Sequence, residues 1–239
     1  MKIITAFLLL LSVGSITAQE RSRTTDSVSI NYLKTANQSA TLYYGVEYES
    51  YTQAKNNPYL TKSPCTRASL SYRNVVYTEV CLRLDLWKDE LTVLSPDSRY
   101  FVLFPEDVEY AEMFNKHVFY HKTDSFLNSP STGYYFLLYD NNCRVLEKKY
   151  ATLIQRDKTV RTEWTIIDFD IKTHYYLLKD NVYHLIKNKN DLLNALSPYK
   201  KELKQFISSN RLSFRKNAAE LLIQTTGEYE KLVANPSVN

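Results

Sequence analysis

Tight-turn signals between β-rich runs constrain the fold of this chain more than any other feature. Runs of aromatic and β-branched residues recur from about residue 39 to 188. In "STGYYFLLYDNNCRVLEKKYATLI", Asn141-Asn142 separates two such runs, and Asn tolerates the left-handed conformation that two-residue hairpin loops require. The same arrangement recurs around Asn115-Lys116 and Asp180-Asn181. Strands joined by tight turns predict an antiparallel β meander.

The overall composition agrees with a β-rich chain. The 239 residues include 20 Tyr and only 4 Gly, and tyrosine suits the half-buried surface of a pleated sheet. Charged residues make up 23% of the chain, an ordinary share that argues against disorder. The net charge of +4 is too small to predict nucleic-acid binding.

The hydrophobic period changes from strand-like to helical after about residue 188. Asn190 or Asp191 is a candidate N-cap for a short helix, "DLLNAL", and Ser197-Pro198 for a second, "PYKKELKQFISS". A third helix is expected over "KNAAELLIQTTGEYEKLV", although Gly227 lowers the helix propensity of its middle. Such short helices are unstable alone, so we expect them to pack on the sheet.

The first residues have the layout of a secretory signal peptide. In "MKIITAFLLLLSVGSITAQ", Lys2 precedes an apolar run from Ile3 to Val13, and small residues end at Ala18. The run is too short to span a bilayer, which takes about 20 residues. We therefore expect cleavage after Ala18, an exported chain, and no transmembrane segment after cleavage.

These patterns predict an α+β fold: a mainly antiparallel β meander followed by a C-terminal helical segment. The expected parts are a signal peptide (1–18), a polar lead-in (19–38), the β domain (39–188), helices packed on it (189–233) and a tail (234–239). Whether the strands form a barrel-like sheet or a two-layer sandwich is left open.

The acidic stretch "VCLRLDLWKDELTVL", residues 80–94, reads as a strand and a turn. Leucines alternate with Arg83 and Asp85, and a period of two predicts a strand with one buried face. We therefore expect Asp85 on the solvent face, and Asp89 and Glu90 in the bend of a hairpin. A calcium loop would need alternating oxygen ligands and a glycine; a glycosidase pair completed by a distant carboxylate remains an alternative.

Three cysteines follow the signal segment, an odd number for an exported protein. The favoured hairpin register sets Arg67 opposite Glu79 and Cys65 opposite Cys81, and facing residues can lie close enough for a disulfide. We predict a Cys65–Cys81 disulfide and a free thiol at Cys143.

Motifs of the common enzyme classes are absent. The chain has no HExxH, GxSxG, phosphate-binding loop, GxGxxG or CxxC. His117 and His121 have the spacing of metal ligands on a helix, but in a strand they lie about 13 Å apart, too far to share one ion. We expect no cofactor, no metal and no enzymatic activity; a hydrolase with scattered carboxylates is the remaining enzymatic alternative.

Two surfaces are candidates for binding. The segment "TLYYGVEYESYTQAKNNPYL" could line a groove for a small molecule or glycan, and binding would then alter the fluorescence of Trp87 or Trp164; core and rim packing of the sheet is the alternative. The tyrosines concerned are Tyr43, Tyr44, Tyr48, Tyr51 and Tyr59.

The other candidate is basic. Residues 187–216 contain eight Lys or Arg and only two acids. A solvated helix face is one explanation. A docking patch for an acidic partner or anionic lipids, centred on Lys200, Lys201 and Lys204, is the other.

Several segments together resemble a known family. They are "ATLYYGVEYESYTQAKNNPYL", "SLSYRNVVYTEVCLRLDLWKDEL", "STGYYFLLYDNNCRVLEKKY" and the ending from "KNKNDLLNAL" to "GEYEKL". The set resembles uncharacterised exported envelope proteins of Gram-negative bacteria with TonB-dependent uptake systems. Arg73-Asn74 departs from the family's glycine- and aspartate-bearing turn. The family has no assigned activity, so the resemblance assigns no functional residue.

The resemblance implies a periplasmic location, with an extracellular or outer-membrane-associated one as the alternative. We expect a non-catalytic protein that acts through contacts with another envelope protein. The alternative is a protein that binds a small molecule or glycan.

Overall fold

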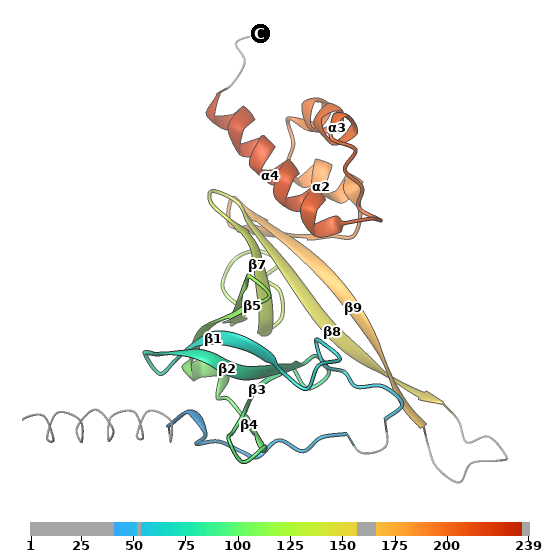
Figure 1. Ribbon diagram of the computed structural model, residues 1–239. Helices are drawn as coiled ribbons and strands as arrows, with labels where there is room; N and C mark the ends of the chain where they lie inside the picture. Colours follow the sequence, from blue (N-terminus) through green and yellow to red (C-terminus); the bar gives the residue numbers. More distant parts are fainter. Residues whose placement is uncertain (1–40, 52–53, 157–165, 236–239) are drawn as a thin grey trace, which may run out of the picture. The chain divides into compact units, whose positions relative to one another are not determined.

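The computed structural model describes residues 41–51, 54–156 and 166–235, and these form one antiparallel sheet followed by helices (Figure 1). The ten strands have the order β10-β9-β8-β7-β6-β5-β1-β2-β3-β4 and do not close into a barrel. The predicted α+β fold is confirmed. The signal segment, the lead-in up to residue 38, Trp164 and residues 236–239 lie outside the described residues.

The strands form two meanders, β1 to β4 and β5 to β10, which join because β5 pairs with β1 instead of with β4. The single meander predicted from the turns is therefore interrupted between β4 and β5, where the chain crosses from one edge strand back to β1. The strands are β1 (Thr66–Tyr72), β2 (Val75–Asp85), β3 (Glu90–Leu94), β4 (Tyr100–Val102), β5 (Val108–Met113), β6 (Lys116–His121), β7 (Gly133–Asp140), β8 (Arg144–Arg156), β9 (Ile166–Lys179) and β10 (Val182–Ile186). The helices are a 3-10 turn, η1 (Pro105–Asp107), then α2 (Lys189–Ala195), α3 (Lys200–Ser209) and α4 (Ala218–Ala234).

Two-residue turns join several of the hairpins. Asp180-Asn181 connects β9 and β10 with φ values of 50° and 62°, as predicted. The turn between β5 and β6 is Phe114-Asn115, one residue earlier than predicted, because Met113 pairs with Lys116. Arg73-Asn74 also adopts positive φ at both positions, so this pair forms a tight turn without glycine.

The β7–β8 loop is longer than the predicted two-residue turn. Asp140 pairs with Arg144, which leaves three residues, 141–143, in the loop. The pairing register also shifts between Leu137 and Tyr139. A three-residue loop therefore replaces the two-residue turn expected at Asn141-Asn142, and β7 carries a bulge just before it.

The predicted disulfide joins Cys65 to Cys81, with 5.4 Å between the Cα atoms. The register expected around it is wrong. Cys81 faces Arg67, and an extra residue in β2 shifts the pairing near Glu79, which has φ 58°. This bulge also reverses the inward and outward positions of β2, so Val76 is 60% exposed instead of buried.

An N-terminal segment, residues 54–60, runs between two strands that are far apart in the sheet order. The Lys55 amide donates to the Ile167 carbonyl of β9 at 2.9 Å, and the Leu60 amide donates to the Leu84 carbonyl of β2 at 3.0 Å. The largest hydrophobic core contains residues from β1 to β3 and from β5 to β9. The segment therefore connects β9 and β2 beside this core.

Both outer strands of the sheet carry a further segment on their free edge. Val46 accepts a hydrogen bond from Val102 of β4, and Leu127 accepts one from Tyr183 of β10, each 2.9 Å long. Covered edges cannot pair with a second chain. The two edges are thus protected by loops of the same molecule.

A second hydrophobic core forms where the helices meet the neighbouring ends of β7 to β10 (Figure 1). Leu192, Leu203 and Leu221 bring α2, α3 and α4 into it, and Val145 and Leu177 line it from the sheet. The expected packing of the helices on the sheet is therefore present.

The predicted helix caps are wrong for the first two helices. Asn188 caps α2, because its side chain accepts hydrogen bonds from the amides of Asn190 and Asp191, and Asp191 reaches back to the Lys187 amide at 2.9 Å. This arrangement resembles a capping box, except that Asp191 accepts from the amide of the residue before the N-cap. The Ser197 amide donates to a carbonyl of α2, so Ser197 lies at the end of α2, and α3 begins only at Lys200.

Candidate functional site

The acidic turn between β2 and β3 is built around Asp85. The predicted hairpin is present, but the expectation that Asp85 faces solvent is wrong: its exposed fraction is 0%. Its carboxylate accepts hydrogen bonds from the hydroxyls of Tyr48 at 2.5 Å and Tyr51 at 2.7 Å. It also accepts bonds from the backbone amides of Trp87 and Lys88. Asp85 therefore holds the turn and the N-terminal tyrosine segment together.

Arg83 lies on the same side of β2 and is also buried, with 7% of its surface exposed. Its guanidinium carbon lies 4.7 Å from the ring centre of Tyr48, 4.2 Å from that of Tyr59 and 3.5 Å from that of Tyr100. Such contacts stabilise a cation that lacks water. The polar side of β2 is thus a second buried surface, because the N-terminal segment covers it.

The five tyrosines proposed as a ligand face differ in how exposed they are. Tyr48 and Tyr59 are buried, and burial together with the Asp85 hydrogen bond raises the pKa of both Tyr48 and Tyr51. Tyr43 is half-buried, and Tyr44 is 71% exposed. The five rings do not share one exposed face, and the Tyr48 and Tyr51 hydroxyls are occupied by Asp85.

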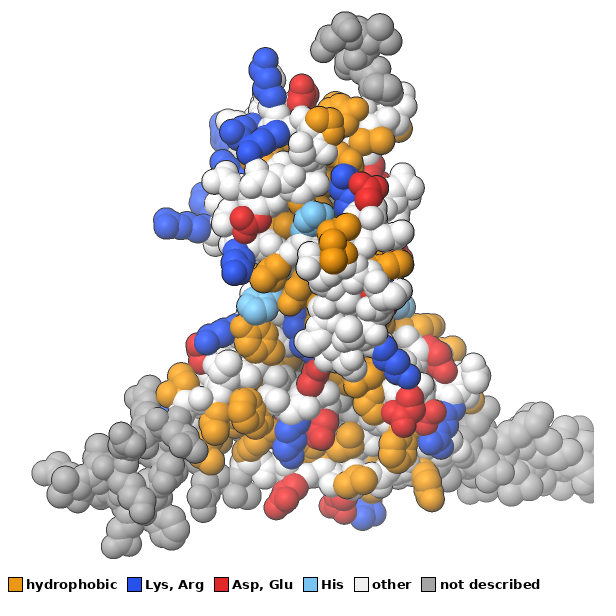
Figure 2. Space-filling view, turned by 180° about the vertical axis from the view of Figure 1, so that it is seen from behind, with side chains coloured by type: hydrophobic (Ala, Val, Ile, Leu, Met, Phe, Trp, Pro, Cys, Tyr) orange, Lys and Arg blue, Asp and Glu red, His pale blue; other side chains and the backbone are white. Residues whose placement is uncertain are grey.

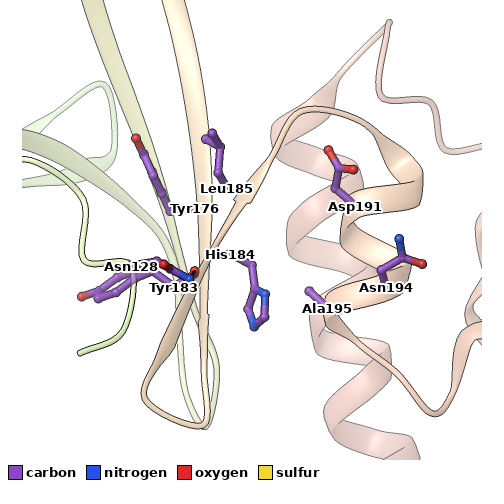
Figure 3. Close-up of a pocket in the computed structure, with 8 residues that line it drawn as sticks. All are labelled: Asn128, Tyr176, Tyr183, His184, Leu185, Asp191, Asn194 and Ala195. Carbon is purple, nitrogen blue, oxygen red and sulfur yellow. Dashed lines mark hydrogen bonds between the residues drawn. The ribbon is translucent and has the colours of Figure 1, made fainter.

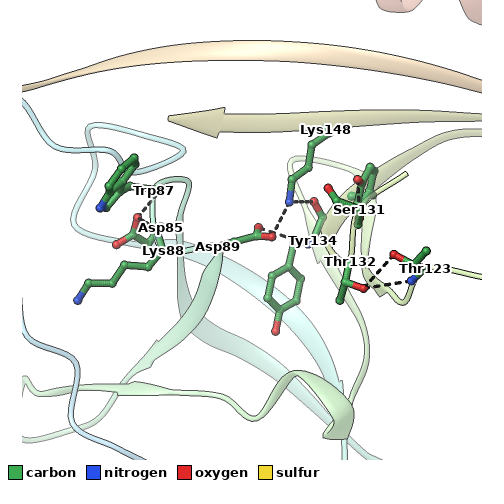
Figure 4. A network of polar contacts seen from close by, with 10 residues as sticks. Asp85, Trp87, Lys88, Asp89, Thr123, Ser131, Thr132, Tyr134 and Lys148 are labelled. Atoms are coloured by element: carbon green, nitrogen blue, oxygen red, sulfur yellow. Dashed lines mark hydrogen bonds and ion pairs between the residues drawn. The ribbon is translucent and has the colours of Figure 1, made fainter. Parts of the chain in front are cut away.

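Asp89 joins the same turn to β7 and β8 (Figure 4). Its carboxylate pairs with the Lys148 ammonium at 2.6 Å and accepts a hydrogen bond from the Tyr134 amide at 3.3 Å. Lys148 is buried, and burial lowers its pKa while Asp89 opposes that shift. A Cβ on Gly133 would lie 1.9 Å from an Asp89 oxygen, so only glycine fits there.

Asp85 and Asp89 are therefore structural rather than free groups. A glycosidase needs two carboxylates that can flank the bond to be cleaved. Asp85 is enclosed by four donors, and Asp89 is paired with Lys148. The third acid, Glu90, is half-buried, and burial raises its pKa.

The free cysteine lies beside a buried glutamate that sequence reasoning missed. Cys143 is buried and unpaired, as predicted, and burial raises the pKa of its thiol to about 11. Glu230 of α4 accepts hydrogen bonds from the Cys143 amide at 2.6 Å, the Tyr139 hydroxyl at 2.7 Å and the Asn141 side chain at 2.8 Å. Glu230 therefore fastens α4 to the β7–β8 loop, and Cys143 stays protonated at neutral pH.

A cleft of about 440 Å³ lies between the β9–β10 hairpin and α2 (Figure 3). Its walls come from the loop before β7, from β9 and β10, and from α2. The residues that line it are Asn128, Tyr176, Tyr183, His184, Leu185, Asp191, Asn194 and Ala195. No sequence motif unites them, because they come from four separate segments of the chain.

The basic side chains predicted as a docking patch lie on α3. Lys201 and Lys204 are exposed, and Lys200 is half-buried with its ammonium 2.6 Å from the Asn194 side-chain oxygen. In the space-filling view, Lys and Arg side chains gather on the α3 side of the helices (Figure 2). Whether this surface binds a partner remains a prediction.

The part of the chain that the structure describes contains neither a cluster of metal ligands nor a membrane-spanning helix. Within it, no group of three or more His, Cys, Asp or Glu side chains could hold a metal ion. None of the helices in these ranges combines the length and hydropathy of a membrane span.

Comparison with known proteins gave no match: no family model, curated protein or solved structure is significantly similar to this chain. The family resemblance noted in the sequence therefore stays a prediction.

Proposed function

We propose that this is an exported, non-catalytic envelope protein that acts by binding an acidic surface of a partner protein through α3 and the loop that follows it. Export is supported by the layout of residues 1–18. The basic surface supports the binding mode.

The observation that carries the proposal is that these cations have no carboxylate partner among the described residues. Within the described residues, none of the eight Lys and Arg side chains between 187 and 216 forms an ion pair with a carboxylate. Elsewhere in the molecule, Arg73 pairs with Asp107 at 2.6 Å and Lys116 pairs with Glu147 at 3.0 Å. Unpaired cations on one surface leave their attraction available to an acidic partner.

The experiment is crosslinking of the tagged protein in its native envelope, followed by purification and identification of the crosslinked chains. In the test variant, Lys200, Lys201 and Lys204 are each changed to Glu. The matched control reverses Lys122, Lys172 and Lys231, which are exposed lysines on other elements, so both variants change the net charge equally. We expect a stoichiometric partner with the wild type and the control, and its loss from the α3 variant.

Two results would contradict the proposal. A partner that both variants retain, or that both lose, would show that the α3 surface does not determine binding. Recovery of the wild-type protein only as an uncrosslinked monomer would also overturn it.

Export has a separate test. Cell fractionation and N-terminal sequencing should find the protein in the envelope fraction with Gln19 as its first residue. A chain that begins at Met1 and stays in the cytosolic fraction would remove the envelope part of the proposal.

A further inference from the structure

We infer that the cleft between the β9–β10 hairpin and α2 is a binding site for a neutral saccharide of one or two sugar units. The cleft adjoins the basic α3 surface, because the Asn194 side chain in its wall accepts a hydrogen bond from Lys200, but none of the residues that line it is a lysine of that surface. The inference therefore does not depend on the proposed function.

The size and walls of the cleft suit a small polar ligand. Its volume of about 440 Å³ falls within the range of about 300–1,000 Å³ that is usual for small-molecule sites. Figure 3 shows His184 between the hairpin and α2, with Tyr176 and Leu185 on the strands and Asn194 and Ala195 on the helix. Of the two tyrosines in the walls, Tyr183 is buried and its hydroxyl binds Asp124, so Tyr176 is the ring on which a sugar can stack while its hydroxyls form hydrogen bonds with the polar groups.

The polar groups of the cleft retain unused hydrogen-bonding capacity. The His184 backbone pairs with Leu177 of β9, but within the described residues its imidazole forms no hydrogen bond, so a neutral ring there offers one donor and one acceptor. The Asn194 oxygen binds Lys200, which leaves the amide NH₂ group free to donate. The Asp191 bonds to Lys187 and Asn188 use one carboxylate oxygen, and the other can still accept.

This mixture of donors and acceptors matches hydroxyl groups, which both donate and accept. A nucleobase or an aromatic acid presents fewer such groups and more apolar edge. Several hydroxyls on one ring would satisfy the histidine, the amide and the carboxylate together.

The charges around the cleft disfavour an anionic ligand. Asp191 in the wall repels an anion. Burial and the nearby Lys179 ammonium lower the pKa of His184, while Asp180 opposes this shift. An uncharged ligand rich in hydroxyl groups can use the donors and acceptors of the cleft without forming an ion pair.

The inference can be tested by NMR titration of the ¹⁵N-labelled protein. The probes are glucose, galactose, mannose, N-acetylglucosamine, maltose, cellobiose and lactose, each added to millimolar concentration, with adenosine and benzoate as non-sugar ligands. We expect at least one sugar to shift the signals of His184, Leu185 and Asn194, and the non-sugar ligands to leave them unchanged.

Two variants give the expected dependence on the cleft. His184→Ala and Asn194→Ala should each weaken binding of that sugar about tenfold, the usual effect of losing one well-placed hydrogen bond. The matched controls His117→Ala and Asn210→Ala change the same residue types at surface positions outside the cleft and should leave the affinity unchanged. The spectrum of each variant shows directly whether it is folded.

The inference is overturned if no sugar shifts the cleft signals, or if the shifts lie elsewhere on the molecule. It is also overturned if adenosine or benzoate binds the cleft more tightly than every sugar. Equal affinities of the cleft and control variants would show that these two side chains do not form the site.

Discussion

The turn between β2 and β3 and the surface of α3 both carry charged side chains, but they hold them in opposite ways. At the turn, Asp85 and Lys148 are buried, and each has partners within the molecule. On α3, Lys201 and Lys204 are exposed, and within the described residues they have none. Because a buried charge without partners costs several kcal/mol, the turn must be complete for the protein to fold. The α3 charges carry no such requirement and remain available for binding.

The largest effect should come from breaking the buried turn. Asp85→Ala removes the acceptor of four hydrogen bonds and leaves two tyrosine hydroxyls without it. We expect a loss of about 4 kcal/mol in the free energy of unfolding, measured by urea denaturation. Asp170→Asn, at an exposed ion pair with Lys172, is the control and should leave stability unchanged. A loss in Asp85→Ala no larger than in the control would mean that the turn does not organise this region.

The disulfide between Cys65 and Cys81 of β2 should rank next. Replacing both Cys65 and Cys81 by Ser opens a loop with a sequence separation of 16, which should cost about 3 kcal/mol. A reducing agent should lower the melting temperature of the wild type but have no further effect on the double variant. Thiol titration of the unreduced, denatured wild type should find one free thiol, at Cys143; three thiols would contradict the pairing.

Protonation of a buried histidine should lower the free energy of unfolding in acid, by less than loss of the disulfide does. His121 packs against Tyr135 and Tyr183, and burial lowers its pKa from the ordinary value of 6.5. The unfolded chain therefore takes up a proton at a pH where the folded chain does not. Stability should be complete above about pH 6.5 and fall as the pH drops below it.

The corresponding measurement is the free energy of unfolding at pH 7.5 and pH 5.5. His121→Gln should reduce the loss on acidification, whereas His117→Gln, at the surface, should retain it. If His121→Gln loses as much stability on acidification as the wild type does, His121 is not the group responsible.

The smallest effect on stability should come from the α3 surface. Reversing the charges of Lys201 and Lys204, the two exposed lysines, should change the free energy of unfolding by less than about 0.5 kcal/mol, as is usual for exposed positions. Thermal unfolding of the purified variant checks this. If the variant lost as much unfolding free energy as Asp85→Ala, the lysines would have a structural role like that of the buried turn.

Local patterns determined much of the fold. Asp180-Asn181 formed the predicted turn, because a left-handed conformation at two adjacent polar residues suffices for a two-residue hairpin. The cysteine pairing was also correct, although the register behind it was not. A bulge near Glu79 moved Arg67 opposite Cys81, yet Cys65 still lay within disulfide distance of Cys81. Neighbouring strands keep such residues close over a range of registers, so this prediction survived the error.

Which segment covers the polar face of a strand was decided only by the tertiary structure. Alternation along β2 identified the side that bears Leu82 and Leu84 as buried, which is correct. It could not show that the N-terminal segment lies over the other side and encloses Arg83 and Asp85. The same holds for Glu230, which meets the β7–β8 loop far from it in sequence. Periodicity shows which side chains share a face of a strand. It does not show which distant segment packs on that face, because such contacts depend on the fold of the whole chain.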